Sequence, residues 1–322
     1  MAETGDIIAT YQMAGDEGLS PADAFESISD ALSDIYEEEG WAALRTVIAD
    51  LIDSCAETTK EAEKFVDGFF DIVAGGGDSL TDEDAWFFED LVRDYPDSLK
   101  FVDTLASIYS ELINQNDDTY FPKLARLSDE HPHMSGVALY YVYALVNLWI
   151  ETYKRKVTTQ QYTQAVQRVK ELYEAHPREE FAEQYADGLE HLAQMQDNEE
   201  DAVRIIAVIE DLLDKWHDDH IAAVYLSALT RLTWLQDERG CAATIAHMAS
   251  LWDDYPYSHE DLAMNMAYSL ANYSLCVSGP QNEAVLQNIS DLAPWWKPAA
   301  RLASELRDGS DTGSAHKPKK AA

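Results

Sequence analysis

One side-chain pattern returns seven times along the chain and limits what the chain can fold into. In most copies an aromatic residue is followed at offsets 3, 4 and 7 by a small, a large apolar and a further apolar residue, as in Tyr185-Gly188-Leu189-Leu192. These offsets place four side chains on one face of an α-helix. The copies begin at Phe25, Phe65, Phe101, Tyr141, Tyr185, Tyr225 and Met266, and the Phe25 copy exchanges its two middle residues. Successive copies begin 36 to 44 residues apart, so the pattern predicts a helix repeated about every 40 residues.

A second marker keeps the same period. Leucine is followed five residues later by proline in LVRDYP, LSDEHP, LYEAHP and LWDDYP, which end at Pro96, Pro132, Pro177 and Pro256. Related segments end at Ala56, His217 and Lys297. Because proline disfavours α geometry in the residue before it, each segment predicts the end of a second helix. The ring before the proline, as in His131 and Tyr255, is predicted to be packed, and the GGG at 75–77 is predicted to be a turn.

Each repeat is therefore a pair of helices, and one pair cannot bury its own apolar faces. Stacked pairs bury them against their neighbours, as in solenoid proteins. We predict an all-α fold, a right-handed α-α superhelix of about seven helix-turn-helix repeats over residues 20–307. Residues 1–19 are predicted to be a flexible N-terminal segment and 308–322 a disordered C-terminal tail, with a capping helix over 298–307.

The aromatic-x-x-apolar-small-x-x-apolar helix, followed by a helix that ends in Leu-x-x-x-x-Pro, resembles the tetratricopeptide repeat over residues 20–297. The resemblance implies a solenoid that binds peptides in its concave groove. The family repeats every 34 residues, a shorter period than here. Its leucine and glycine also stand in the opposite order to that of six of the seven copies. Armadillo and HEAT repeats share the longer period with other signatures, and they stay open as alternatives.

Charge narrows the class of partner. The chain has 60 Asp and Glu against 23 Lys and Arg, a formal net charge of −37. Such a surface repels nucleic-acid phosphates and attracts basic proteins or peptides. The alternative is that the acidic residues serve solubility in a salt-rich cytoplasm, where salt screens their repulsion.

Location and membrane contact follow from other features of the sequence. Cys55, Cys241 and Cys276 are far apart and form no CxxC pair, which does not suggest a disulfide framework. The N-terminal sequence MAETGDIIATYQ lacks the basic and apolar regions of a secretory signal. The apolar run at 137–150 is too short to span a bilayer. We therefore expect a cytoplasmic protein without membrane insertion.

Motifs for catalysis or metal binding are weak. His217 and His220 of HDDH flank two aspartates at a predicted helix boundary, where capping explains them better than a metal. YEEEGW (36–41) and TDEDAW (81–86) lack the spacing of a calcium loop and are predicted to be a helix end and a helix start. We expect no cofactor, no metal and no enzymatic activity. An enzyme with an unrecognised site stays open as the third hypothesis.

The polar positions of the first helices mark a candidate groove. Counted from the aromatic residue as zero, positions 1 and 5 are mostly apolar or small, whereas positions −1, 2 and 6 are mixed. The candidate partner-binding residues are Tyr140, Tyr143, Asn147, Gln184, Asp187, His191, Ser227, Arg231, Asn265, Tyr268 and Asn272. The alternative is a merely solvated face. Asp67, Asp103 and Asp187 argue against a clamp for a peptide carboxylate, as known from the resembling family.

These features favour a non-enzymatic interaction scaffold or adaptor that holds a basic or neutral peptide segment. The second hypothesis is a structural, self-associating repeat protein or a non-catalytic subunit of a larger complex. A specific foreign partner would favour the first hypothesis, and self-association alone would favour the second.

Overall fold

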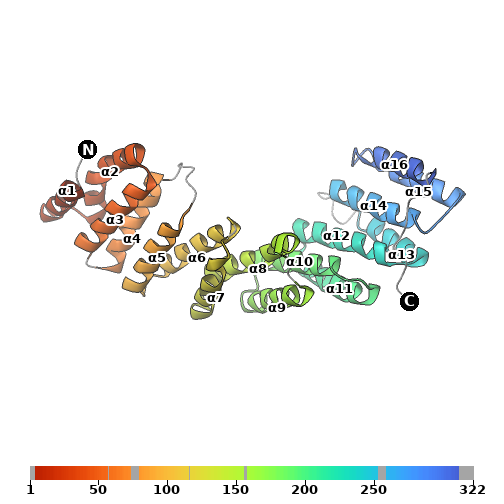
Figure 1. The fold of residues 1–322 in the computed structure, drawn as a ribbon, viewed down its shortest axis with the longest axis horizontal. Helices are drawn as coiled ribbons and strands as arrows, with labels where there is room; N and C mark the ends of the chain where they lie inside the picture. Colours follow the sequence, from red (N-terminus) through yellow and green to blue (C-terminus); the bar gives the residue numbers. More distant parts are fainter. Residues whose placement is uncertain are drawn as a thin grey trace. The chain divides into compact units, whose positions relative to one another are not determined.

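A computed structural model describes residues 4–56, 58–73, 80–115, 117–155, 158–252 and 259–311. Within these ranges the chain is all-α, with sixteen α-helices, one 3-10 turn and no strand (Figure 1). The chain divides into two compact units, Met1–Ala144 and Leu145–Ala322. The prediction that residues 20–307 form one continuous domain stays a prediction. The 75–77 turn and Tyr255 lie outside the described residues.

The first unit holds α1 to α7 and the start of α8. Their bounds are α1 Thr4–Asp16, α2 Pro21–Glu39, α3 Trp41–Cys55, α4 Thr59–Val73, α5 Asp82–Asp94, α6 Leu99–Asn114, η1 Asp118–Tyr120, α7 Phe121–Glu130 and α8 Ser135–Arg155. Helix α2 packs against α1, α3 and α4, and α6 packs against α5 and α7. Ser20 caps α2, and Pro21 opens it.

The second unit holds the rest of α8 and α9 to α16. Their bounds are α9 Thr159–Ala175, α10 Glu179–Gln194, α11 Glu199–Trp216, α12 Asp219–Leu235, α13 Glu238–Ser250, α14 His259–Ser274, α15 Pro280–Asp291 and α16 Ala299–Asp311. Helix α12 packs against α10, α11, α13 and α14, and α14 packs against α13, α15 and α16. Helices α10, α12 and α14 thus each contact the next even-numbered helix and the helices on either side of them in sequence. This packing is compatible with a helical repeat.

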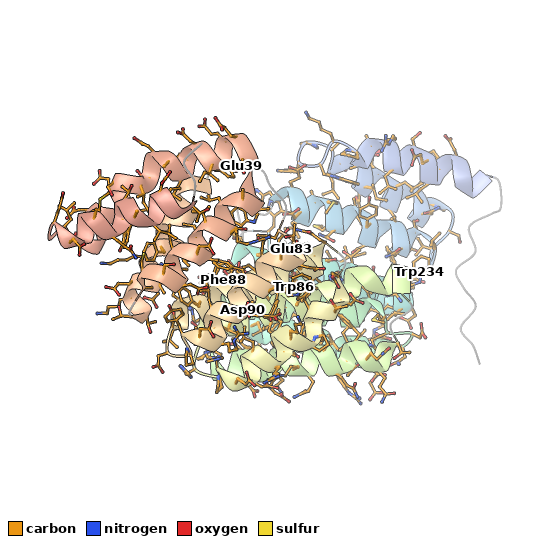
Figure 2. All side chains as sticks on the ribbon, turned by 60° about the vertical axis from the view of Figure 1, so that its left-hand side comes forward. Glu39, Glu83, Trp86, Phe88, Asp90 and Trp234 are labelled. Carbon is orange, nitrogen blue, oxygen red and sulfur yellow. The ribbon has the colours of Figure 1, made fainter. Side chains whose placement is uncertain are left out.

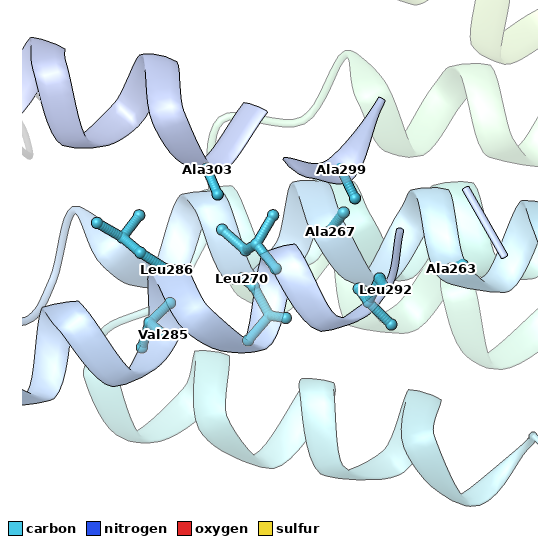
Figure 3. Close-up of a cluster of buried hydrophobic side chains, with 9 residues drawn as sticks. Ala263, Ala267, Leu270, Val285, Leu286, Leu292, Ala299 and Ala303 are labelled. Atoms are coloured by element: carbon cyan, nitrogen blue, oxygen red, sulfur yellow. The ribbon is translucent and has the colours of Figure 1, made fainter. Parts of the chain in front are cut away.

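The seven copies of the motif fall in α2, α4, α6, α8, α10, α12 and α14. Their first residues are buried in most copies: Phe65, Phe101, Tyr141, Tyr185 and Tyr225 are at most 8% exposed. In the last helices, small residues let backbones approach. Ala263 and Ala267 of α14 and Ala299 and Ala303 of α16 are all fully buried (Figure 3).

The proline stops act as predicted. Tyr95, His131 and His176 precede proline and cap α5, α7 and α9, with φ between −123° and −127° and ψ between 57° and 75°. This common geometry is outside the α region, because the following proline excludes it. Tyr95 and His176 also pack on Phe101 and Phe181, with ring centroids 6.0 and 5.5 Å apart. At the end of α11, His217 stands where the other segments have proline. There the helix ends because the backbone of His217 is in the left-handed conformation, with φ 52°.

At the N-terminus the structure has a helix within the segment that is predicted to be flexible. Residues 4–16, predicted to be flexible, form α1, which packs against α2 and α3. Ile7 and Ala14 are buried, and the Tyr11 ring lies 4.9 Å from that of Phe65. The physical reason is that α1 covers apolar surface of α2 and α3 that would otherwise face water. At the other end α16 extends to Asp311, four residues beyond the predicted boundary at 307. Residues 312–322 lie outside the described part.

A buried aspartate links α3 to α5 in the first unit. Asp84 is 1% exposed, and its Oδ1 atom lies 2.5 Å from Nη1 of Arg45 and also accepts from the Trp41 indole N–H. Its Oδ2 atom accepts from the backbone N–H and the hydroxyl of Thr81, both at 2.8 Å. The helix start predicted at TDEDAW is thus a capping box. Its Asp84 also forms an ion pair with Arg45 of α3, the second helix of the preceding pair. Trp86 and Asp90 lie further along the same helix and are labelled in Figure 2.

Gly188 lies where α10 comes close to α9. A Cβ atom at Gly188 would lie 3.4 Å from Cγ2 of Val166, and the backbone oxygen of Gly188 accepts from the Tyr162 hydroxyl at 3.3 Å.

We expect Gly188→Leu to lower the free energy of unfolding by about 1–3 kcal/mol, because the larger side chain forces the helices apart. Gly188→Ala is the control. Its methyl group makes ordinary contact and gains helix propensity, so stability should stay within about 1 kcal/mol of the wild type. Urea titrations measure both, and equal stability of the leucine variant would contradict the close crossing.

Candidate functional site

The candidate groove residues lie on α8, α10, α12 and α14, but they do not form an open face. Among the eleven, only Tyr268 is exposed, at 44%, whereas Asn265 is buried at 7%. The other nine are partly buried. Those on α10, α12 and α14 are followed in the next paragraphs.

Between α10 and α12 the polar positions meet one another. The Ser227 hydroxyl donates to Oε1 of Glu190 at 2.6 Å. The His220 Nε2 atom lies 3.0 Å from Oδ1 of Asp187. The Arg231 guanidinium donates to the backbone oxygen of Gln196 at 3.0 Å. These contacts join residues 33 to 37 positions apart in sequence, about one repeat.

Between α12 and α14 the same arrangement continues. The Thr230 hydroxyl donates to Oδ1 of Asn265 at 3.0 Å, and the Asn272 amide donates to the Thr233 hydroxyl at 3.0 Å. The Asn272 amide also donates to the backbone oxygen of Thr230 at 3.3 Å. We call the cross-helix set the polar seam: Asp187, Glu190, His220, Ser227, Thr230, Arg231, Asn265 and Asn272. The prediction that Asn265 faces a groove is therefore corrected, because it is buried in this seam.

Glu190 is the buried carboxylate of the seam and was not among the predicted residues. It is 5% exposed, it accepts hydrogen bonds from Ser227 and Gln194, and its Oε2 lies 2.9 Å from Nδ1 of His191. Burial pushes the pKa of Glu190 up, but the donors His191, Ser227 and Gln194 outweigh it and hold the pKa below its ordinary value. The sequence does contain a sign that Glu190 is unusual. It lies five residues after Tyr185, at a position that is mostly apolar or small in the earlier copies of the motif.

His220 is the second titrating group of the seam. The hydrogen bond that the His220 ring donates to Asp187 raises the pKa of His220 against the opposing effect of burial, and Glu183 and Asp218 add to the rise. Its neighbours are therefore carboxylates on α10 and at the start of α12. The HDDH motif has the capping role predicted for it: Asp218 is the N-cap of α12 and accepts from the backbone N–H of Ile221 at 2.9 Å.

The remaining predicted residues lie on α8, α10 and α14. Tyr140 and Tyr143 lie at the end of the first unit and Asn147 at the start of the second, all three partly buried on α8. Gln184 is partly buried on α10. Tyr268 lies apart from the seam contacts of Asn265 and Asn272, and its ring is 5.4 Å from that of Trp296.

Two surface hollows lie in the first unit. One, of about 460 Å³, is lined by Tyr11, Cys55 and Glu61 among others, and burial raises the pKa of the Cys55 thiol and so disfavours its reactive form. The other, of about 350 Å³, lies between α5, α6 and α7. There the Lys123 ammonium is held by Glu89 at 2.7 Å and lies over the Tyr120 ring.

In the part of the chain that the structure describes, no group of three or more His, Cys, Asp or Glu side chains is placed to hold a metal ion. No helix of that part is both long and apolar enough to cross a bilayer. No protein-family model matches the chain, and no curated protein matches it.

Proposed function

We propose that this protein is a non-enzymatic scaffold that binds a basic peptide segment of a partner protein. In this proposal the helix pairs continue as a right-handed α-α superhelix related to the tetratricopeptide repeat. The repeated motif and the contacts among α10, α12 and α14 support the superhelix. Cys55, Cys241 and Cys276 form no disulfide in the described part of the chain, which supports a reducing compartment, the cytoplasm.

The observation that carries the proposal is the charge. The excess of carboxylates gives a net charge of −37, and many of the cations are already paired with carboxylates on their own helix, as in Arg93 with Asp90, Arg126 with Glu130 and Arg204 with Glu200. The excess negative charge therefore remains on the solvent-facing sides of the helices. Such a field attracts cationic segments and repels nucleic acids and other acidic proteins.

The polar seam supports a scaffold in a second way. Hydrogen bonds between successive motif helices specify how one repeat is placed on the next, because each buried donor needs its particular acceptor. A surface built on such repeats is preorganised, so less conformational entropy is lost when a partner binds.

Salt dependence tests the proposal. A short peptide of alternating lysine and alanine should bind at about 0.01 M salt and dissociate at about 1 M, where the screening length falls from about 30 Å to 3 Å. Over the same range the melting temperature should rise, because self-repulsion is screened. Calorimetric titration measures the binding, with an acetyl-lysine version of the peptide as the uncharged control.

The other readings give different results. A protein whose acidity serves only salt adaptation gains stability and shows no preference for the lysine peptide. A self-associating structural protein shows its main response in sedimentation velocity, without the peptide. Equal binding of the charged and acetylated peptides would contradict the proposed function.

A further inference from the structure

Five aromatic rings gather near the end of the second unit. Trp252 follows α13, His259 and Tyr268 are on α14, and Trp295 and Trp296 lie between α15 and α16. We call these five residues the aromatic patch. The Trp252 ring stacks on that of His259 at 4.9 Å and meets the Trp295 ring edge to face at 5.0 Å and 80°. Tyr268 and Trp296 form a second pair, with centroids 5.4 Å apart.

The aromatic patch is not simply part of the core. Trp295 is 46% exposed and Tyr268 is 44% exposed, whereas Trp252 and Trp296 are partly buried against the apolar cluster of α14, α15 and α16. The partly buried rings contact the exposed ones, Trp252 against Trp295 and Trp296 against Tyr268, so the exposed rings stand on a packed base. Tryptophan and tyrosine with one face packed and the other in water are enriched at protein interfaces.

The charges near the aromatic patch are mostly negative. Glu260 and Asp261 follow His259 in the first turn of α14, and Asp291 ends α15; all three are exposed. Lys297 is the exposed cation beside Trp296, and Arg301 lies next along α16, 3.5 Å from Glu305. A cation that approaches the Trp295 ring therefore meets both the π-face and neighbouring carboxylates.

We infer that the aromatic patch binds lysine or arginine side chains of a basic peptide segment, with a cationic group over the exposed face of Trp295. The inference rests on the proposed function and gives it a location. Charge complementarity selects this occupant: the π-faces and the nearby carboxylates both favour a cation. A second copy of the chain would bring another charge of −37 against the same surface.

The test compares Trp295→Leu with Trp86→Leu in the full chain. Leucine keeps apolar packing against Trp252 but removes the π-face, and Trp86 on α5 is a matched control because it is 52% exposed. We expect Trp295→Leu to weaken the binding of the lysine-alanine peptide by about threefold to thirtyfold, the range of a cation–π contact. Trp86→Leu should change the affinity less than twofold, about the precision of the titration. Trp295→Phe should retain part of the affinity.

Each result decides a different question. Binding by the wild type with equal affinity for Trp295→Leu overturns the aromatic patch and leaves the proposed function standing. If the wild type does not bind the lysine-alanine peptide at low salt, both the proposed function and the role of the aromatic patch are overturned. If Trp295→Leu changes the sedimentation coefficient but not the peptide affinity, the aromatic patch is a contact between copies of the chain, and the inference is wrong. Near-ultraviolet circular dichroism of each variant controls for loss of packing.

Discussion

Replacing Asp84 with alanine should lower the free energy of unfolding of the first unit by about 3–5 kcal/mol, because it breaks a buried ion pair on one side only. The side chain of Arg45 is only 14% exposed and would lose its carboxylate. The Trp41 indole and Thr81 would lose acceptors at the same time. Asp84→Asn preserves the volume but not the charge, and we expect most of the loss to remain.

The control for Asp84 lies on the same helix. Asp90 of α5 is 60% exposed, and its Oδ1 atom lies 2.6 Å from Nη1 of Arg93, so Asp90→Asn removes an ion pair of the same chemistry in water. Such pairs contribute about 0–1 kcal/mol. Urea titrations followed by circular dichroism measure both variants. Equal and small losses would mean that Asp84 does not hold α3 and α5 together.

Replacing Glu190 with alanine should cost the second unit about 2–3 kcal/mol, because the donors of Ser227 and Gln194 would lose a buried acceptor. A double-mutant cycle with Ser227→Ala isolates the contact across α10 and α12. We expect a coupling free energy of about 0.5–3 kcal/mol, and a coupling near zero would exclude the seam as a stabilising contact.

The pH dependence of the same group has a definite sign. The pKa of Glu190 is lower in the folded chain than its ordinary value of 4.5, so its ionised form is favoured by folding. Its contribution to stability is full above about pH 4.5 and is lost as the pH falls through the lowered pKa of the folded state. Glu190→Gln should therefore flatten the stability profile in the acid range. An unchanged profile would contradict the assignment.

Local periodic signals gave reliable predictions. The copies of the motif at Phe101 and Tyr185 lie in α6 and α10, because offsets of 3, 4 and 7 match the helical turn wherever the helix packs. The stop before Pro177 was predicted for an equally local reason, since proline acts on the residue next to it. Helix α1 was missed because it stands outside the repeat and has neither marker.

The candidate groove was the least successful prediction. Polar residues on one helix face indicate solvent only if no partner covers them, and the sequence does not say which distant residue will pair. Asn265 meets Thr230 across 35 residues, and Asp84 meets Arg45 across 39. The polarity of the positions was real, but on α10, α12 and α14 many of these side chains pair across the seam between helices.

The all-α class, most helix ends and the net charge of −37 could be read from the amino-acid sequence. These properties depend on neighbours within a few positions or on composition. The folded structure was needed to find that Glu190 and Asn265 are buried, that α1 packs on α2 and α3, and that Trp252 meets Trp295 while Tyr268 meets Trp296. Burial and side-chain pairing depend on which helices pack together. Contacts between residues that are far apart in sequence produce no periodic pattern along the chain, so they could not be predicted from it.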